Sequence, residues 1–347
     1  LKKIIESYYF EGFIYLFRFL SNIILIRLLG PELNGKFAYL LAIIGIFNFV
    51  NIFSSDIIIY SEAVKKKINS RIIYNNNLIK LFMGFIFIIT IFVYLKYIEN
   101  EFSNLIFFTL VITELLRQII NNYFQFYLQA LNRVVKYKFL DLIGYIYLCL
   151  AFFILLYLNV TNFLILAILL LIKEIFVSLM CFIKNKDIPF KFNFDLKNII
   201  YSFNFGKYLI LPKLTNIAAA NITVLILGSS GYYIEAGVLA ILARLKILVL
   251  FPINAIEPII RRAYFKFSEG SSFDNLNNFN KAYINLITFY LCSLITFIII
   301  NSEIIIIFIF GNDYLYINSF MIIYLFIILI NIFIRTSTYL YHVNNDT

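Results

Sequence analysis

The sequence predicts an all-α fold, a polytopic bundle of transmembrane helices. Of its 347 residues, 62% are apolar and only 14% are charged, a balance far from that of soluble domains. Apolar stretches of about twenty residues recur with short polar gaps, and this length crosses about 30 Å of hydrocarbon. The bilayer is therefore the expected surroundings of most of the chain.

Ten membrane spans are expected. They cover residues 10–29, 37–60, 78–95, 104–128, 139–158, 163–183, 200–227, 234–260, 282–300 and 318–341. The first span has no small-residue cleavage site and carries Glu11 and Arg18, which predicts a retained helix rather than a signal peptide. The seventh contains Pro212 among several polar residues, so we expect it to break or bend.

The charges of the loops predict the orientation. Lys and Arg collect after the second, fourth, sixth and eighth spans, for example at Lys65, Lys136, Lys186 and Arg261. Such residues concentrate in cytoplasmic loops, so both ends of this chain are predicted to face the cytoplasm. This topology explains most of the net charge of +10 without a nucleic-acid partner. No loop is long enough for a separate catalytic domain.

The chemistry-bearing residue types are few. His342 is the single histidine, and the three cysteines lie in apolar stretches without C-x-x-C spacing. This pattern excludes catalysis that depends on histidine and favours no zinc or other metal site. We therefore expect neither a cofactor nor an enzymatic activity.

One hairpin of the sequence is repeated. The stretch from Leu28 to Gly30 is similar to that from Ile226 to Gly228, at an offset of 198 residues, and similar sequence continues after both. Many transporters build a central cavity between two repeats, so two pseudo-symmetric halves around a cavity are expected. We divide the chain into an N-terminal lobe of six helices (1–183), a cytoplasmic linker (184–199) and a C-terminal lobe of four helices (200–347).

The first of these hairpins carries a family resemblance. Arg27 to Glu32 reads R-L-L-G-P-E and is followed by Gly35 and Phe37-Ala38. This resembles the signature of polysaccharide flippases, the O-antigen and capsule exporters of the multidrug/oligosaccharidyl-lipid/polysaccharide superfamily. Further similarity follows at Tyr127 to Arg133, and from Gly228 through Ala236 to Pro252 and Pro258. The resemblance implies twelve helices, so with ten visible we expect a chain truncated at its C-terminal end, with a genuine ten-helix protein as the alternative. The first residue is Leu1 rather than Met, which fits an incomplete reading frame.

The resemblance implies a transport function in the bacterial inner membrane. It implies export of an undecaprenyl-pyrophosphate-linked oligosaccharide repeat unit from the cytoplasmic to the periplasmic leaflet by alternating access. The implied partners are this anionic lipid-linked oligosaccharide and membrane lipids, with a polysaccharide polymerase and a chain-length regulator as further candidates. Nucleic acid is not among them.

Charged residues within the spans indicate where such a substrate would bind. An ionised side chain at mid-bilayer costs about 2.5–3.5 kcal/mol on insertion scales, so it normally faces a wet cavity or a partner. The first, second, seventh and eighth spans carry an excess of cations that suits pyrophosphate. The candidate substrate-binding cations are Arg18, Lys207, Lys213 and Arg244. The polar residues expected in the cavity are Glu11, Tyr15, Asn22, Asn48, Asn51 and Asn216. The candidates for coupling to H⁺ or Na⁺ are Asp56, Glu235 and Glu257.

Several of these residues have a structural alternative. Arg18 can pair with Glu11 or Asp56, and Lys207 can reach the cytoplasmic interface from its helix end. Glu114 and Arg117, three residues apart, are expected to form a structural pair. The adjacent Lys173 and Glu174 have no role that the sequence predicts.

Two other functions compete with a flippase. A drug or cation exporter of the same superfamily is expected to have an acidic cavity, which the cations oppose. A polysaccharide polymerase or ligase is expected to carry a long periplasmic loop, and none is seen. A purely structural membrane protein would leave the repeated hairpin and its central charges unexplained.

Overall fold

The structure is a computed structural model. It describes residues 2–48, 50, 51, 53, 55–64, 70–97, 102–131, 133–186, 188, 190–192, 194–246, 249, 250, 252, 253 and 273–328. The chain divides into two compact units, Leu1–Gly237 and Val238–Thr347.

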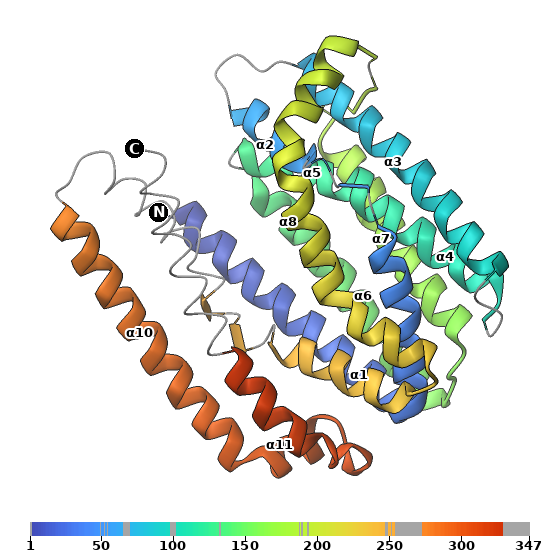
Figure 1. Ribbon diagram of the computed structural model, residues 1–347, viewed down its shortest axis with the longest axis vertical. Coiled ribbons are helices and arrows are strands. Elements are labelled where there is room, and N and C mark those ends of the chain that lie inside the picture. The colour runs from blue at the N-terminus through green and yellow to red at the C-terminus, as the bar shows by residue number, and fades with distance from the viewer. Residues whose placement is uncertain are drawn as a thin grey trace. The chain divides into compact units, whose positions relative to one another are not determined.

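Helices make up the first unit (Figure 1). They are α1 (Lys2–Ile46), α2 (Ser55–Val64), α3 (Ser70–Tyr97), α4 (Asn104–Leu115), the π-helical turn η1 (Leu116–Asn121), α5 (Asn122–Ala130), α6 (Val134–Leu158), α7 (Phe163–Lys184) and α8 (Leu196–Ser229). A further helix covers residues 233–246 and continues into the second unit. The second unit also contains α10 (Phe273–Ile300), α11 (Ser302–Ile309), the short η2 (Asn312–Tyr314) and helical residues 317–328.

The chain is a polytopic helical membrane protein, as the composition predicts. Among the described residues, six helices are long and apolar enough to cross a bilayer, and Lys213–Ser229 and Ile317–Ile328 are shorter apolar helices. Large apolar side chains such as Phe85, Phe289 and Phe308 lie exposed on their helices, as expected where lipid is the solvent. The total of ten spans stays a prediction, because parts of the eighth and tenth lie outside the described residues.

The first helix of α1 ends at Gly30, where the first predicted hairpin turns. Gly30 has φ 70° and ψ 176°, a conformation that glycine adopts without strain. Pro31 follows, and a proline at the first position of a helix loses no hydrogen bond. The element α1 therefore consists of two arms, residues 2–29 and 31–46, which correspond to the first predicted span and the start of the second.

The two repeated hairpins meet at their tips. A side chain at Gly35 would overlap the backbone carbonyl of Tyr233, and one at Gly228 would overlap the ring of Tyr39. A side chain at Gly237 would place its first carbon 3.1 Å from the backbone nitrogen of Gly35, a close approach without overlap. Tyr233 and Gly237 follow Gly35 and Tyr39 by the repeat offset of 198 residues. Tyr39 contacts Tyr233, and Gly237 contacts Gly35. Each contact becomes the other when the two hairpins are exchanged, which is the reciprocal pattern expected of a two-fold axis.

Two predicted spans differ in the structure. The second, expected to be continuous from 37 to 60, ends as a helix at Ile46 and resumes at Ser55. The seventh, expected to break or bend near Pro212, continues as one helix from Leu196 to Ser229, so the break is not found and the bend stays a prediction. A proline removes only one backbone hydrogen bond from a helix. The cluster of Asn and Ser in the second span instead offers several backbone groups an alternative partner.

The helix α3 begins earlier than its apolar stretch. Three buried asparagines at its start bond to the segment that was predicted to be a linker and to the start of α8. Asn75 Nδ2 donates to the Asp195 carbonyl at 2.8 Å, and Asn77 Nδ2 donates to the Lys191 carbonyl at 3.2 Å. Asn76 Nδ2 donates to Ser202 Oγ at 3.1 Å. These bonds let a polar segment continue the helix inside the protein.

Candidate substrate site

A polar layer crosses the first unit between two apolar cores. One core contains Leu40, Phe87 and Phe107, and the other contains Ile59 and Leu140. Along the second span, α3, α4 to α5, α6 and α7, charged or amide residues lie in sequence between residues of one core and residues of the other. The members of this layer that the structure describes are Asn48, Asn51, Asp56, Lys80, Glu114, Arg117, Gln118, Asn121, Asp141, Lys173 and Glu174.

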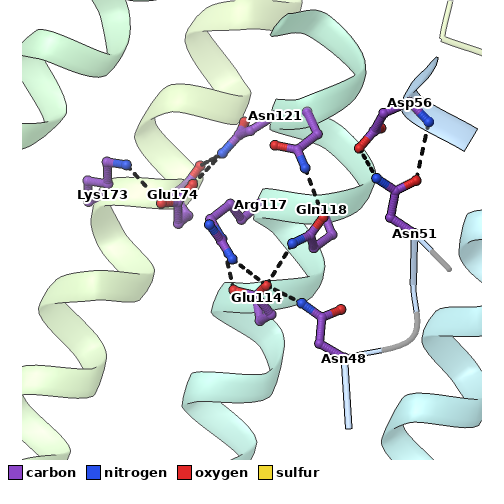
Figure 2. Close-up of polar contacts among 10 residues, drawn as sticks. Asn48, Asn51, Asp56, Glu114, Arg117, Gln118, Asn121, Lys173 and Glu174 are labelled. Carbon is purple, nitrogen blue, oxygen red and sulfur yellow. Dashed lines mark hydrogen bonds and ion pairs between the residues drawn. The ribbon is translucent and has the colours of Figure 1, made fainter. Parts of the chain in front are cut away.

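The break in the second span begins this layer. Asn51 Oδ1 accepts a hydrogen bond from the backbone N–H of Asp56 at 3.2 Å, and Asn51 Nδ2 donates to the Asp56 carboxylate. These bonds satisfy groups at the start of α2 that a helix end leaves open. The amide side chain of Asn51 therefore takes over part of the bonding that a continuous helix would supply (Figure 2).

Lys80 connects the break to the π-helical turn. Its ammonium forms an ion pair with Asp56 and donates to the Gln118 carbonyl at 3.1 Å. The Asn122 N–H, which an α-helix would aim at the Gln118 carbonyl, instead donates to the Arg117 carbonyl. The π-helical turn thus offers the Gln118 oxygen to Lys80, and such turns occur often at functional sites.

Glu114 collects donors from three residues (Figure 2). Arg117 contributes two bonds, at 2.8 Å from Nε and 2.5 Å from Nη2, which confirms the predicted pair. Gln118 donates to Glu114 at 2.9 Å, and Asn48 donates from across the break. The Arg117 side chain nevertheless keeps 49% of its surface exposed.

Lys173 and Glu174 form a second cluster with α6. Lys173 Nζ lies 2.9 Å from Asp141 Oδ1 and 2.9 Å from Glu174 Oε1. Asn121 Nδ2 donates to Glu174 Oε2 at 2.5 Å, and Asn121 Oδ1 accepts a hydrogen bond from Ser178 Oγ at 2.9 Å. Lys173 therefore joins two acidic side chains, which gives it a structural role that its sequence neighbours do not reveal.

Arg18 lies at the edge of this cluster. Its Cζ is 5.9 Å from the ring centroid of Tyr145, whose ring also faces Lys173 Nζ at 4.3 Å. Both acidic partners considered for Arg18 are occupied, because Glu11 lies 2.5 Å from Lys138 and Asp56 pairs with Lys80. Arg18 is exposed, and no carboxylate of the described part of the chain lies within ion-pair distance. Its charge is therefore available to a ligand.

The cations of α8 differ in their surroundings. Lys213 is half-buried, and its Nζ donates to the Asn51 carbonyl at 2.6 Å. Lys207 is exposed and lies 3.5 Å from Asn204 Oδ1. Lys213 thus belongs to the break in the second span, whereas Lys207 lies nearer the start of α8.

The other predicted site residues are placed as follows. Asn22 donates to the Arg18 carbonyl at 2.8 Å, Tyr15 is half-buried and Glu235 is exposed. Arg244 is half-buried and belongs to the second unit. The side chain of Asn216 and the whole of Glu257 lie outside the described residues. The structure thus brings Asn48, Asn51, Asp56 and Lys213 together, and it places Glu11 and Arg18 against α6 instead.

Sequence reasoning missed Lys80, Asp141 and Tyr145. A usable signal existed for the two charged residues, because each is the single charged residue of its predicted span, 78–95 and 139–158. Tyr145 gave no signal among 26 tyrosines. Within the described residues, no group of three or more His, Cys, Asp or Glu side chains is arranged to hold a metal.

Comparison with known protein families gives one result that decides the assignment. Residues 24–319 match the polysaccharide biosynthesis protein family. The chain belongs to this family. It is a family of Wzx-like flippases, usually transporters rather than enzymes, which confirms the resemblance seen in the R-L-L-G-P-E hairpin. Comparison with curated proteins and with solved structures gave no match.

Proposed function

We propose that this polysaccharide biosynthesis protein moves an undecaprenyl-pyrophosphate-linked oligosaccharide repeat unit from the cytoplasmic to the periplasmic leaflet by alternating access. The family match over residues 24–319, on a chain of membrane-spanning helices, carries the proposal. Such a substrate needs a polar path for its sugars and an anion-binding group for its pyrophosphate. Its lipid tail can stay in the bilayer throughout.

The polar layer supplies the path. Buried charges in a membrane protein are costly unless they are paired or face water, and they commonly mark a substrate pathway. The charges of the layer are paired, and the part of Arg117 that remains exposed beside Glu114 is the group we propose to meet sugar hydroxyls. Acidic groups are also compensated, since Lys80 holds Asp56 and Lys173 holds Asp141 and Glu174. This weakens Asp56 as an ion-coupling residue in favour of Glu235 and Glu257.

Arg18 supports recognition of the pyrophosphate. A guanidinium presents a planar set of donors that matches phosphate oxygens in pairs. Arg18 is exposed and stacked over Tyr145, so it has no charged bond of the described structure to break before it binds an anion. Lys213, Lys207 and Arg244 remain the further cations proposed for the substrate path.

The symmetry of the hairpins supports alternating access. Their reciprocal contacts are those expected where two inverted or parallel repeats meet, and transporters of this kind rock two halves around a central site. We place the boundary between these halves at residues 184–199, within a twelve-helix plan. From the loop charges we propose that the N-terminus of this chain faces the cytoplasm of a bacterial cell.

The test is complementation of a strain that lacks its polysaccharide flippase. The full-length gene is expressed as wild type, as Arg18→Ala and as Lys136→Ala, which removes an exposed cation of a predicted loop. We expect wild type and Lys136→Ala to restore surface polysaccharide and Arg18→Ala to restore little at equal membrane levels. Export of cationic dyes by a wild type that restores no glycan would replace the flippase proposal with a drug exporter.

A further inference from the structure

The contact between the second span and α8 is unusually close. We call this contact, between residues 31–64 and α8, the seam. A methyl group at Gly206 would lie 2.6 Å from the carbonyl oxygen of Phe53, and one at Gly45 would lie 2.7 Å from Asn221 Oδ1. The ring centroids of Phe53 and Phe203 are 4.2 Å apart. The seam thus packs α8 against the part of the second span that is not helical.

A break of this kind leaves backbone groups that need partners. Irregular backbone at membrane depth persists only where protein covers it or where it lines a water-filled cavity. Asn51 has its side chain engaged with Asp56, and its carbonyl accepts the hydrogen bond from Lys213. Lys213 is therefore a link across the seam from α8 to the break.

The charge of Lys213 is only partly compensated by this bond. The Asn51 carbonyl is neutral, and no carboxylate of the described residues lies within ion-pair distance of Lys213. Asp56, which lies nearest in the network, is held by Lys80 and by the Asn51 amide. An anion adds charge–charge attraction to its hydrogen bond with the ammonium, which the neutral carbonyl cannot, so it can displace the carbonyl.

We propose that the Lys213–Asn51 bond is a latch that closes the seam, and that the phosphate groups of the substrate release it. This rests on the proposed function for the identity of the substrate. Phosphate draws Lys213 away from the Asn51 carbonyl, and the break then loses the partner that α8 supplies. The seam loosens between Phe53 and Gly206, which couples anion binding to movement of α8.

Disulfide cross-linking across the seam tests this in the full chain, reconstituted in vesicles. Cys149, Cys181 and Cys292 are replaced by alanine, and Phe53→Cys and Phe203→Cys supply the reporter pair. The matched control pair is Phe10→Cys with Phe139→Cys, whose rings are 6.0 Å apart at a contact of α1 with α6, away from the seam. Inorganic pyrophosphate and undecaprenyl pyrophosphate are the probes, and the first distinguishes the anion from the lipid.

We expect pyrophosphate to lower cross-linking of the seam pair several-fold and to leave the control pair unchanged. Lys213→Met should lower the yield without pyrophosphate and abolish the response, Lys213→Arg should retain both, and Lys197→Met should behave as wild type. Equal cross-linking with and without either probe overturns the latch, and so does a response that survives Lys213→Met. The pyrophosphate response is read in the Lys213 protein itself, so it does not depend on how the Met variant folds.

The outcomes separate the latch from the transport proposal. Complementation that succeeds while the seam ignores both probes removes the latch and leaves the flippase function intact. A seam that responds to both probes, in a protein that restores no glycan, supports the latch and overturns the repeat-unit assignment.

Discussion

Lys80 and Asp56 form an ion pair from which solvent is excluded, since their side chains are 0% and 3% exposed. The pair joins α3 to the first turn of α2, directly after the break in the second span. Because Lys80 also donates to the Gln118 carbonyl, a single ammonium connects three elements of the polar layer. This places the pair among the interactions that hold the broken helix in position.

Removing one partner of this pair should destabilise the protein strongly. We expect Lys80→Met to cost about 3–5 kcal/mol, because it leaves Asp56 buried without its counter-ion. The measurement is the midpoint of heat-induced loss of monodisperse protein in detergent. The double variant Lys80→Met with Asp56→Leu should recover much of the loss, since it buries no unpaired charge. Similar midpoints for Lys80→Met and wild type would contradict the burial of the pair.

The Lys173 cluster makes a related prediction with an asymmetry. Lys173 neutralises both Asp141 and Glu174, so Lys173→Met should destabilise more than Asp141→Asn, which leaves the Lys173 bond to Glu174 in place. A double-mutant cycle on Lys173 and Asp141, followed by thermal midpoints, measures the coupling. Additive effects of the two substitutions would show that the pair does not interact.

The sequence was sufficient for the fold class and for the existence of a charged interior. Apolar stretches of bilayer length identify spans regardless of how they pack, and the glycine-centred hairpin at Gly30 was visible as a repeat of Gly228. The ion pair of Glu114 with Arg117 was also predictable, because residues three apart share one face of a helix.

The partners across helices were not predictable. Lys80 and Asp56, or Lys173 and Asp141, lie on different helices, and nothing local specifies which helices pack together. The break after Ile46 was missed because its apolar content matches a continuous span, although Asn48, Asn51 and Ser55 offered the backbone other partners. The seventh span was expected to break or bend because it contains Pro212 among polar residues, yet α8 continues as one helix through this proline.

The seam predicts an effect of size at Gly206. Gly206→Val should lower the amount of folded protein in the membrane, because its side chain would meet the Phe53 carbonyl, and α8 would have to move away from the break. Ala219→Val adds two of the three carbons that Gly206→Val adds, on an exposed position of the same helix, and serves as the control. Fluorescence-detected size exclusion of tagged protein compares the two. A loss of folded protein with both variants would assign the effect to α8 itself rather than to the seam.

Arg18 should separate transport from stability. Its side chain is exposed, and its described contact with Tyr145 at 5.9 Å is a cation–π interaction worth about 0.5–1 kcal/mol at an exposed site. Arg18→Ala should therefore leave the thermal midpoint nearly unchanged while export of polysaccharide falls at least about tenfold, as expected when about 1.4 kcal/mol of substrate binding is lost. Arg18→Lys keeps the charge but not the paired donors, so export should be intermediate.

Polysaccharide at the cell surface and the midpoint in detergent are measured on the same preparations. A large fall in the midpoint of Arg18→Ala would show that Arg18 stabilises the helix bundle, and the anion-binding role would then have to be assigned to Lys213 or Arg117.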